Sequence, residues 1–117
     1  MLSLPANGRI VLCTQAVDMR KSFDGLSAMV SNSLSLQPLS GDLFVFLNAK
    51  RDLMKLLWWD TGGFCLLAKR LELGRFRLPE LPMNECVMHV DRAVLAMIFD
   101  GIEVRNVKRL KRYSPNL

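Results

Sequence analysis

Three apolar runs that follow one another at short intervals constrain the fold of this chain more than any other feature. They cover residues 42–48, 54–60 and 64–70 and are rich in leucine and aromatic side chains. Strands joined by only a few residues run antiparallel, because a parallel pair needs a crossover of about a dozen residues or more. The second gap contains Gly62 and Gly63, which permit the positive φ angles of a tight turn. The sequence therefore predicts a three-stranded antiparallel meander.

Further short strands and two helices are expected around this meander. Residues 23–34 place apolar side chains on one face of a helix, with Ser22 or Asp24 as its N-cap. A second, largely buried helix is expected between Asp91, a suitable N-cap, and Gly101, a suitable C-terminal stop. Short extended segments are expected at residues 9–13, 74–79 and 87–90.

The fold class that follows is α+β. We expect a single small antiparallel sheet, a meander, with two helices packed on one face and a basic C-terminal tail. The chain has 117 residues, which suits a single domain. We place that domain at residues 1–103 and the tail at residues 104–117.

The excess positive charge lies entirely in this tail. The chain has 16 Lys and Arg residues against 11 Asp and Glu residues, a net charge of +5, and its last acidic residue is Glu103. Clustered cations bind polyanions by releasing counterions from phosphates, which makes nucleic acid a natural partner. The alternative is a tail that only keeps the protein soluble and monomeric. The cations of the tail are Arg105, Lys108, Arg109, Lys111 and Arg112.

Basic residues also lie next to aromatic residues within the domain. Guanidinium groups suit bidentate contacts to phosphate, and aromatic rings can stack on bases. The alternative is an ordinary charged surface over an apolar core, and no run resembles a specific reader of base sequence. The candidate DNA-binding residues of the domain are Arg20, Lys21, Lys50, Arg51, Lys69, Arg70, Arg75 and Arg77.

The chain offers little for catalysis or for binding a cofactor. His89 is the only histidine, and no nucleophile elbow or phosphate-binding glycine loop accompanies it. Asp60, Asp91 and Asp100 sit at expected turns and helix ends, which argues against a carboxylate metal site for strand transfer. We therefore expect a protein that is not an enzyme, with no catalytic residue, no cofactor and no metal.

Cysteine usage and hydropathy favour a cytoplasmic protein. Cys13, Cys65 and Cys86 have no paired short spacing, and the first two lie in apolar segments, as is typical of buried reduced thiols. Zinc would require close pairs of ligands. We see no signal peptide, and no apolar run approaches the roughly 18 residues of a membrane helix.

Four runs resemble those of a known family in the same order. In chain order they are residues 18–26 (DMRKSFDGL); 41–46 (GDLFVF) with Asn48 and 50–52; 55–60 (KLLWWD) with 63–65; and 69–72 (KRLE) with 74–76 and Pro79. Together they are similar to the small accessory protein encoded beside the transposase in insertion-sequence-66 elements, and the likeness spans residues 3–103. Ala49 and Leu53 depart from the family, which tends to have further basic residues there.

This resemblance implies a factor that helps a larger transposase made from another reading frame. It implies no settled biochemical activity, so two hypotheses stay open. In the first, the basic residues and the tail hold DNA phosphates at the ends of the element. In the second, the chain is an adaptor that docks the transposase, or a second copy of itself, without contacting DNA.

Overall fold

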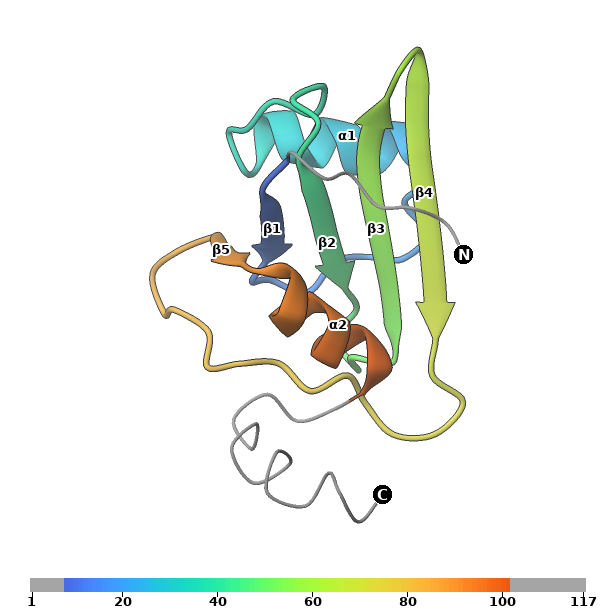
Figure 1. Cartoon of the computed structure of the whole chain (residues 1–117), viewed down its shortest axis with the longest axis vertical. Coiled ribbons are helices and arrows are strands. Elements are labelled where there is room, and N and C mark those ends of the chain that lie inside the picture. The colour runs from blue at the N-terminus through green and yellow to red at the C-terminus, as the bar shows by residue number, and fades with distance from the viewer. Residues whose placement is uncertain (1–7, 102–117) are drawn as a thin grey trace.

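A five-stranded mixed sheet forms the centre of the computed structural model, which describes residues 8–101. Across the sheet the strands lie in the order β4-β3-β2-β1-β5 (Figure 1). The strands and helices are, in chain order, β1 (Ile10–Cys13), α1 (Phe23–Asn32), β2 (Leu43–Leu47), β3 (Leu53–Asp60), β4 (Gly63–Arg70), β5 (Val87–Val90) and α2 (Arg92–Asp100).

The predicted meander is confirmed as one part of this sheet. β2, β3 and β4 are consecutive antiparallel neighbours. Asp60 lies opposite Gly63, so the second turn consists of Thr61 and Gly62 alone. Gly62 has a φ of 84°, the left-handed conformation that glycine adopts without steric cost.

The prediction of a purely antiparallel meander is wrong for the rest of the sheet. β1 pairs with β2 in parallel, with Val11 opposite Phe44, and β5 pairs antiparallel with the other side of β1. The segment between β1 and β2 contains α1 and is long enough to return the chain for a parallel pairing.

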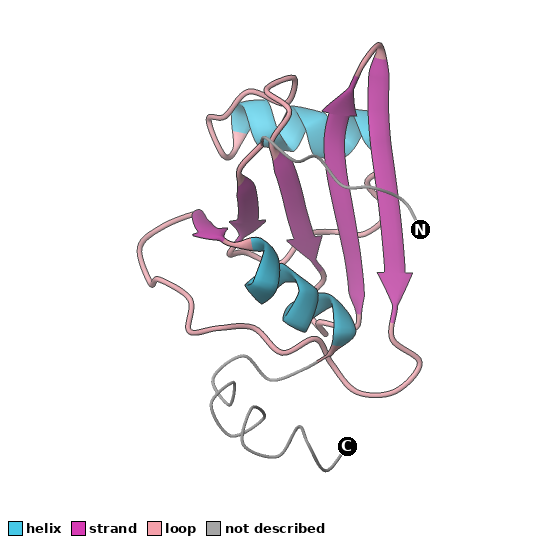
Figure 2. Ribbon diagram, in the orientation of Figure 1, coloured by secondary structure: helices cyan, strands magenta, loops and turns pink. Residues whose placement is uncertain are grey.

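The prediction that both helices pack on one face is also wrong. In Figure 2, α1 lies behind the sheet and α2 lies in front of it. Leu26 and Val30 of α1 pack in one buried cluster, which includes Phe44 and Phe46 of β2. Leu95 and Ile98 of α2 pack in a second cluster, which includes the alternate β2 residues Leu43, Val45 and Leu47. Because every residue of β2 is buried, the strand needs cover on both faces.

The two helices differ in how their ends are stabilised. The side chain of Asp91 accepts a hydrogen bond from the Val94 amide, and Gly101 has a φ of 80°, as expected for these caps. Ser22 is the N-cap of α1, but its side chain makes no capping hydrogen bond, and the helix ends at Asn32.

Residues 71–86 form no strand, so the extended segment expected at 74–79 is wrong. Phe76 is buried in the cluster beneath α2, and its amide donates to the Arg51 carbonyl. The alternation of polar and apolar residues there reflects one anchored side chain in a loop. The extended segment expected at residues 87–90 is confirmed as β5.

The basic tail, with Arg105, Lys108, Arg109, Lys111 and Arg112, lies outside the described residues, as does the expected domain boundary. Among residues 8–101, no helix is long and apolar enough to cross a bilayer. Cys13 is buried, Cys65 is partly buried and Cys86 is exposed. Burial raises the pKa of the Cys13 thiol above its ordinary value.

Candidate nucleic-acid interface

Three loops meet at the end of the sheet toward which β1, β2 and β4 run, the lower end in Figure 1. They are residues 14–22 after β1, residues 48–52 after β2 and residues 71–86 after β4. These loops carry most of the candidate DNA-binding cations of the domain. Loops at one end of a rigid sheet are common positions for binding residues.

Asn48 shapes the loop between β2 and β3. Its Nδ2 donates to Oδ1 of Asp52 over 2.6 Å, and its Oδ1 accepts from the amides of Asp52 and Leu53 over 3.1 Å each. Arg51 takes a φ of 58°, which a non-glycine residue adopts only where surrounding contacts hold it. The result is a tight loop whose two cations, Lys50 and Arg51, are exposed.

Two backbone hydrogen bonds join the loop after β4 to this turn. The Leu71 amide donates to the Asp52 carbonyl, and the Phe76 amide donates to the Arg51 carbonyl, each over 2.7 Å. Because Phe76 is buried and its neighbours are exposed, Arg75 and Arg77 project from the surface close to Arg51.

Lys55 holds the loop after β1, residues 14–22, by binding the backbone of that loop. Its Nζ donates to the carbonyls of Met19 and Lys21 over 2.8 and 2.7 Å, and the Val17 amide donates to Leu47. Lys55 was not among the predicted residues, because nothing in the sequence indicates that its ammonium binds two backbone carbonyls of a distant loop. Its ammonium organises the loop that carries Arg20.

Arg20 is not a free cation. Its guanidinium pairs with the Asp18 carboxylate, with Nη2 and Oδ2 2.7 Å apart, and both side chains are exposed. The hydrogen bonds from Arg20 lower the pKa of Asp18 to about 2. The carboxylate therefore stays ionised near neutral pH and offsets the positive charge of Arg20 locally.

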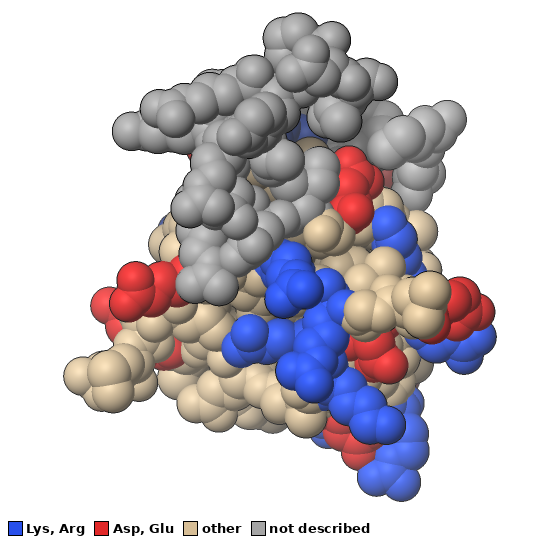
Figure 3. Space-filling view, turned by 90° about the horizontal axis from the view of Figure 1, so that it is seen from below, with Lys and Arg blue, Asp and Glu red and all other residues tan. Residues whose placement is uncertain are grey.

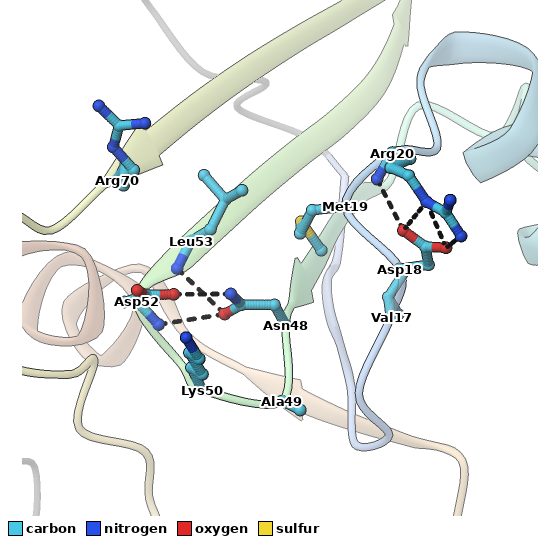
Figure 4. A pocket seen from close by; sticks show the side chains of 10 residues that line it. All are labelled: Val17, Asp18, Met19, Arg20, Asn48, Ala49, Lys50, Asp52, Leu53 and Arg70. Atoms are coloured by element: carbon cyan, nitrogen blue, oxygen red, sulfur yellow. Dashed lines mark hydrogen bonds and ion pairs between the residues drawn. The ribbon is translucent and has the colours of Figure 1, made fainter.

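An open hollow of about 630 Å³ lies between these loops and the end of β4. Val17, Met19 and Leu53 provide its apolar lining. Arg20, Lys50 and Arg70 line it from different segments, and the Arg20 guanidinium is turned toward Asp18 (Figure 4). Asp18 and Asp52 line it as well, so it is an amphipathic depression with cations of three separate segments around it.

Seen from below, Lys and Arg side chains gather in a band across the uncovered part of this end, with acidic side chains beside it (Figure 3). We call this surface the lower surface. Six of the predicted residues line the hollow or lie in the joined loops 48–52 and 71–86: Arg20, Lys50, Arg51, Arg70, Arg75 and Arg77.

Two predicted residues have other contacts. Nζ of Lys69 donates to the Phe99 carbonyl over 2.6 Å and lies 4.4 Å from the centre of the Phe99 ring, so it holds the last turn of α2. The side chain of Lys21 lies along the first turn of α1, where a Cβ added to Gly25 would approach it to 3.2 Å. Neither contact could be predicted from the sequence.

The lower surface can offer exposed guanidinium and ammonium groups to an anion. Among the described residues, no group of three or more His, Cys, Asp or Glu side chains could hold a metal ion. The arrangement suits contact with phosphate groups, which need donors and positive charge but no base or nucleophile.

Comparison with known proteins gives matches along most of the chain. Residues 8–109 match the model of a family described as IS66 Orf2 like protein. Two relatives from Sinorhizobium fredii are described as uncharacterized proteins y4jC and y4hO. The first is 35% identical over 106 residues, which cover 90% of this chain and 89% of the relative. The second is 37% identical over 106 residues, covering 91% and 90% respectively. No solved structure matches the chain.

Proposed function

The chain belongs to the IS66 Orf2-like family, whose role is accessory to transposition, and from this premise we propose that it assists a separate transposase by holding DNA through its lower surface. The cations of that surface contact backbone phosphates, and the basic tail adds further contacts. The protein performs no strand transfer itself.

The observation that carries this proposal is the way separate segments bring cations to one end of the sheet. Lys50 and Arg51 come from one loop, and the bond between Phe76 and Arg51 holds Arg75 and Arg77 beside them. These side chains are exposed, and no ion pair within residues 8–101 involves any of the four. They are therefore available to an external anion.

Phosphate contact explains this surface better than base readout. The described part of the lower surface is made of loops, and within residues 8–101 no helix or paired strand projects from it to enter a major groove. Phosphate contacts position a protein on DNA and carry no sequence information directly. Selection of the ends of the element then falls mainly to the transposase.

The test is a fluorescence anisotropy titration with labelled element-end DNA and a scrambled duplex at several salt concentrations. Affinity should fall steeply with salt, and Lys50→Gln and Arg75→Gln should each reduce the log–log slope by about 0.9. Loss of these cations removes phosphate contacts, so the effect should be similar on both duplexes. A chain ending at Glu103 measures the contribution of the tail.

Two matched variants serve as controls. Lys50→Arg keeps the charge and should keep the slope. Arg9→Gln removes one cation beside Asp42, where β1 and β2 begin, away from the lower surface, and should leave the slope unchanged. A salt response that is flat for the full chain would contradict the proposal.

A second candidate function is a protein adaptor. Leu73 and Met83, both in the loop after β4, are 91% and 97% exposed, which is unusual for large apolar side chains. A docked transposase would cover them. Association with transposase in the absence of DNA, together with a flat salt response, would favour this function over DNA binding.

A further inference from the structure

The outer edge of β4 is long and apolar. The strand has eight residues, and within the described part of the chain it pairs with β3 alone. Phe64, Cys65, Leu66 and Leu67 are all only partly buried. An open edge of this length and character is ready to pair with another strand.

The pairing with β3 determines which backbone groups of β4 face outward. The Leu71 amide donates to the Asp52 carbonyl, so residue 71 directs its groups toward β3. Along an antiparallel strand this direction alternates from residue to residue. The backbone N–H and C=O groups that face β3 therefore belong to residues 63, 65, 67 and 69. Those that face outward belong to Phe64, Leu66, Ala68 and Arg70.

We propose that β4 is a dimerisation edge, on which β4 of a second copy of this chain pairs antiparallel and joins two sheets into one. In one register all four outward residues of each copy have partners. Phe64 then lies opposite Arg70 of the other copy, and Leu66 lies opposite Ala68. This register forms about eight backbone hydrogen bonds between the copies, since each such pair exchanges two.

The two ends of β4 are complementary, which favours a second copy over an unrelated strand. Arg70, which forms an exposed ion pair with Glu72 over 3.5 Å, ends the strand. At the beginning of the strand the Phe64 ring packs edge-on against Trp59, with centroids 5.1 Å apart, and Asp60 lies opposite Gly63 at the end of β3. Antiparallel pairing brings Arg70 of each copy to the aromatic and acidic end of the other. It also keeps the cations at the ends of the two strands apart.

The opposite edge of the sheet lacks these features. β5 has only four residues, and residues 71–86 and α2 directly flank it. Short edge strands are one way in which proteins avoid pairing with other chains. The dimer is therefore expected through β4.

The experiment uses the full chain without DNA, with mass measured by light scattering during size-exclusion chromatography at micromolar concentrations. The wild type should have twice the mass of one chain. Ala68→Pro removes an outward N–H and leaves the hydrogen bonds to β3 in place, so it should give a monomer. Ala68→Ser keeps the N–H and should remain dimeric, and thermal unfolding checks that both variants fold.

A cross-linking measurement tests the register independently. In the proposed dimer, Leu67 lies opposite Leu67 of the other copy in a non-hydrogen-bonded pair, where Cα atoms are about 4.5 Å apart and a disulfide can form. Leu67→Cys, with Cys65 and Cys86 changed to Ser, should cross-link under mild oxidation. Leu66→Cys in the same background should not, because it faces Ala68.

A monomeric wild type at about 100 µM would overturn the proposal. So would a folded Ala68→Pro variant that stays dimeric, or a Leu67→Cys chain that does not cross-link. The proposal does not rest on the proposed function. Both tests are made without DNA and leave the cations of the lower surface unchanged, so failure of one proposal does not decide the other.

Discussion

At the scale of single residues, Asp42 holds the start of the parallel strand pair together. Its carboxylate is almost buried and accepts from the Arg9 amide over 2.9 Å and from the Arg9 guanidinium over 3.1 Å. Burial raises the pKa of Asp42, but the hydrogen bonds from Arg9 and Ser40 outweigh it and leave the pKa below its ordinary value. The ionised form is thus favoured by the fold.

Asp42→Ala should lower the free energy of unfolding at pH 7 by about 1–3 kcal/mol, since it leaves the Arg9 amide without its acceptor. The folded-state pKa is depressed, so the stabilisation is present above the unfolded value of about 3.9 and is lost as pH falls through the folded value. Urea unfolding at several pH values measures both effects. An equal difference between wild type and variant at pH 7 and at pH 2 would contradict the assigned ionisation.

Asp18 limits what Arg20 contributes to the lower surface. Asp18→Asn removes a carboxylate that is ionised near neutral pH and frees the guanidinium, so affinity for duplex DNA should rise and its salt dependence should steepen. Anisotropy titrations at two salt concentrations measure this change. Weaker binding by a folded Asp18→Asn chain would show that the ion pair positions Arg20 for DNA.

At the scale of elements, local patterns predicted which segments form strands and helices but left their arrangement in the sheet open. The meander follows from apolar runs at short spacing, and the caps of α2 follow from Asp91 and Gly101. The parallel pairing of β1 with β2 depends on where the long segment between these two strands brings the chain back to the sheet. No local sequence pattern predicts that position. The unbroken apolar run of β2 is typical of a strand that is buried on both faces, and such a strand requires cover on both sides of the sheet.

Phe76 is the residue on which the loop after β4 depends. It is 1% exposed, and Phe76→Ala should lower the free energy of unfolding by about 3–5 kcal/mol through lost burial and a cavity. Hydrogen exchange of residues 71–86 should increase as well, since the buried anchor is gone. Leu73→Ala in the same loop is the matched control, because Leu73 is 91% exposed and should change stability by about 0.5 kcal/mol or less. Equal losses for both variants would contradict the anchoring role.

At the scale of the whole molecule, the candidate site could be predicted in part. Six of the eight predicted cations of the domain line the hollow or lie in the loops 48–52 and 71–86, because the loops after β1, β2 and β4 share one end of the sheet. The partners of Lys69 and Lys55 could not be predicted, since both ammonium groups bind backbone carbonyls about 30 residues or more away in the chain. The balance of charge between Asp18 and Arg20 likewise depends on side-chain geometry.

The position of β1 between β2 and β5 has a consequence for biosynthesis. Among the described residues, β1 is the first strand in the chain; it gains its neighbour on one side when β2 is made, but its other side stays unpaired until residues 87–90 are made. Until then the nascent chain carries two open sheet edges, β1 and β4, and two apolar sheet faces, one of which still lacks α2. Both β5 and α2 must therefore be made before the core closes, so a chain that ends in the loop after β4 lacks the helix and the strand that cover one of its two apolar clusters.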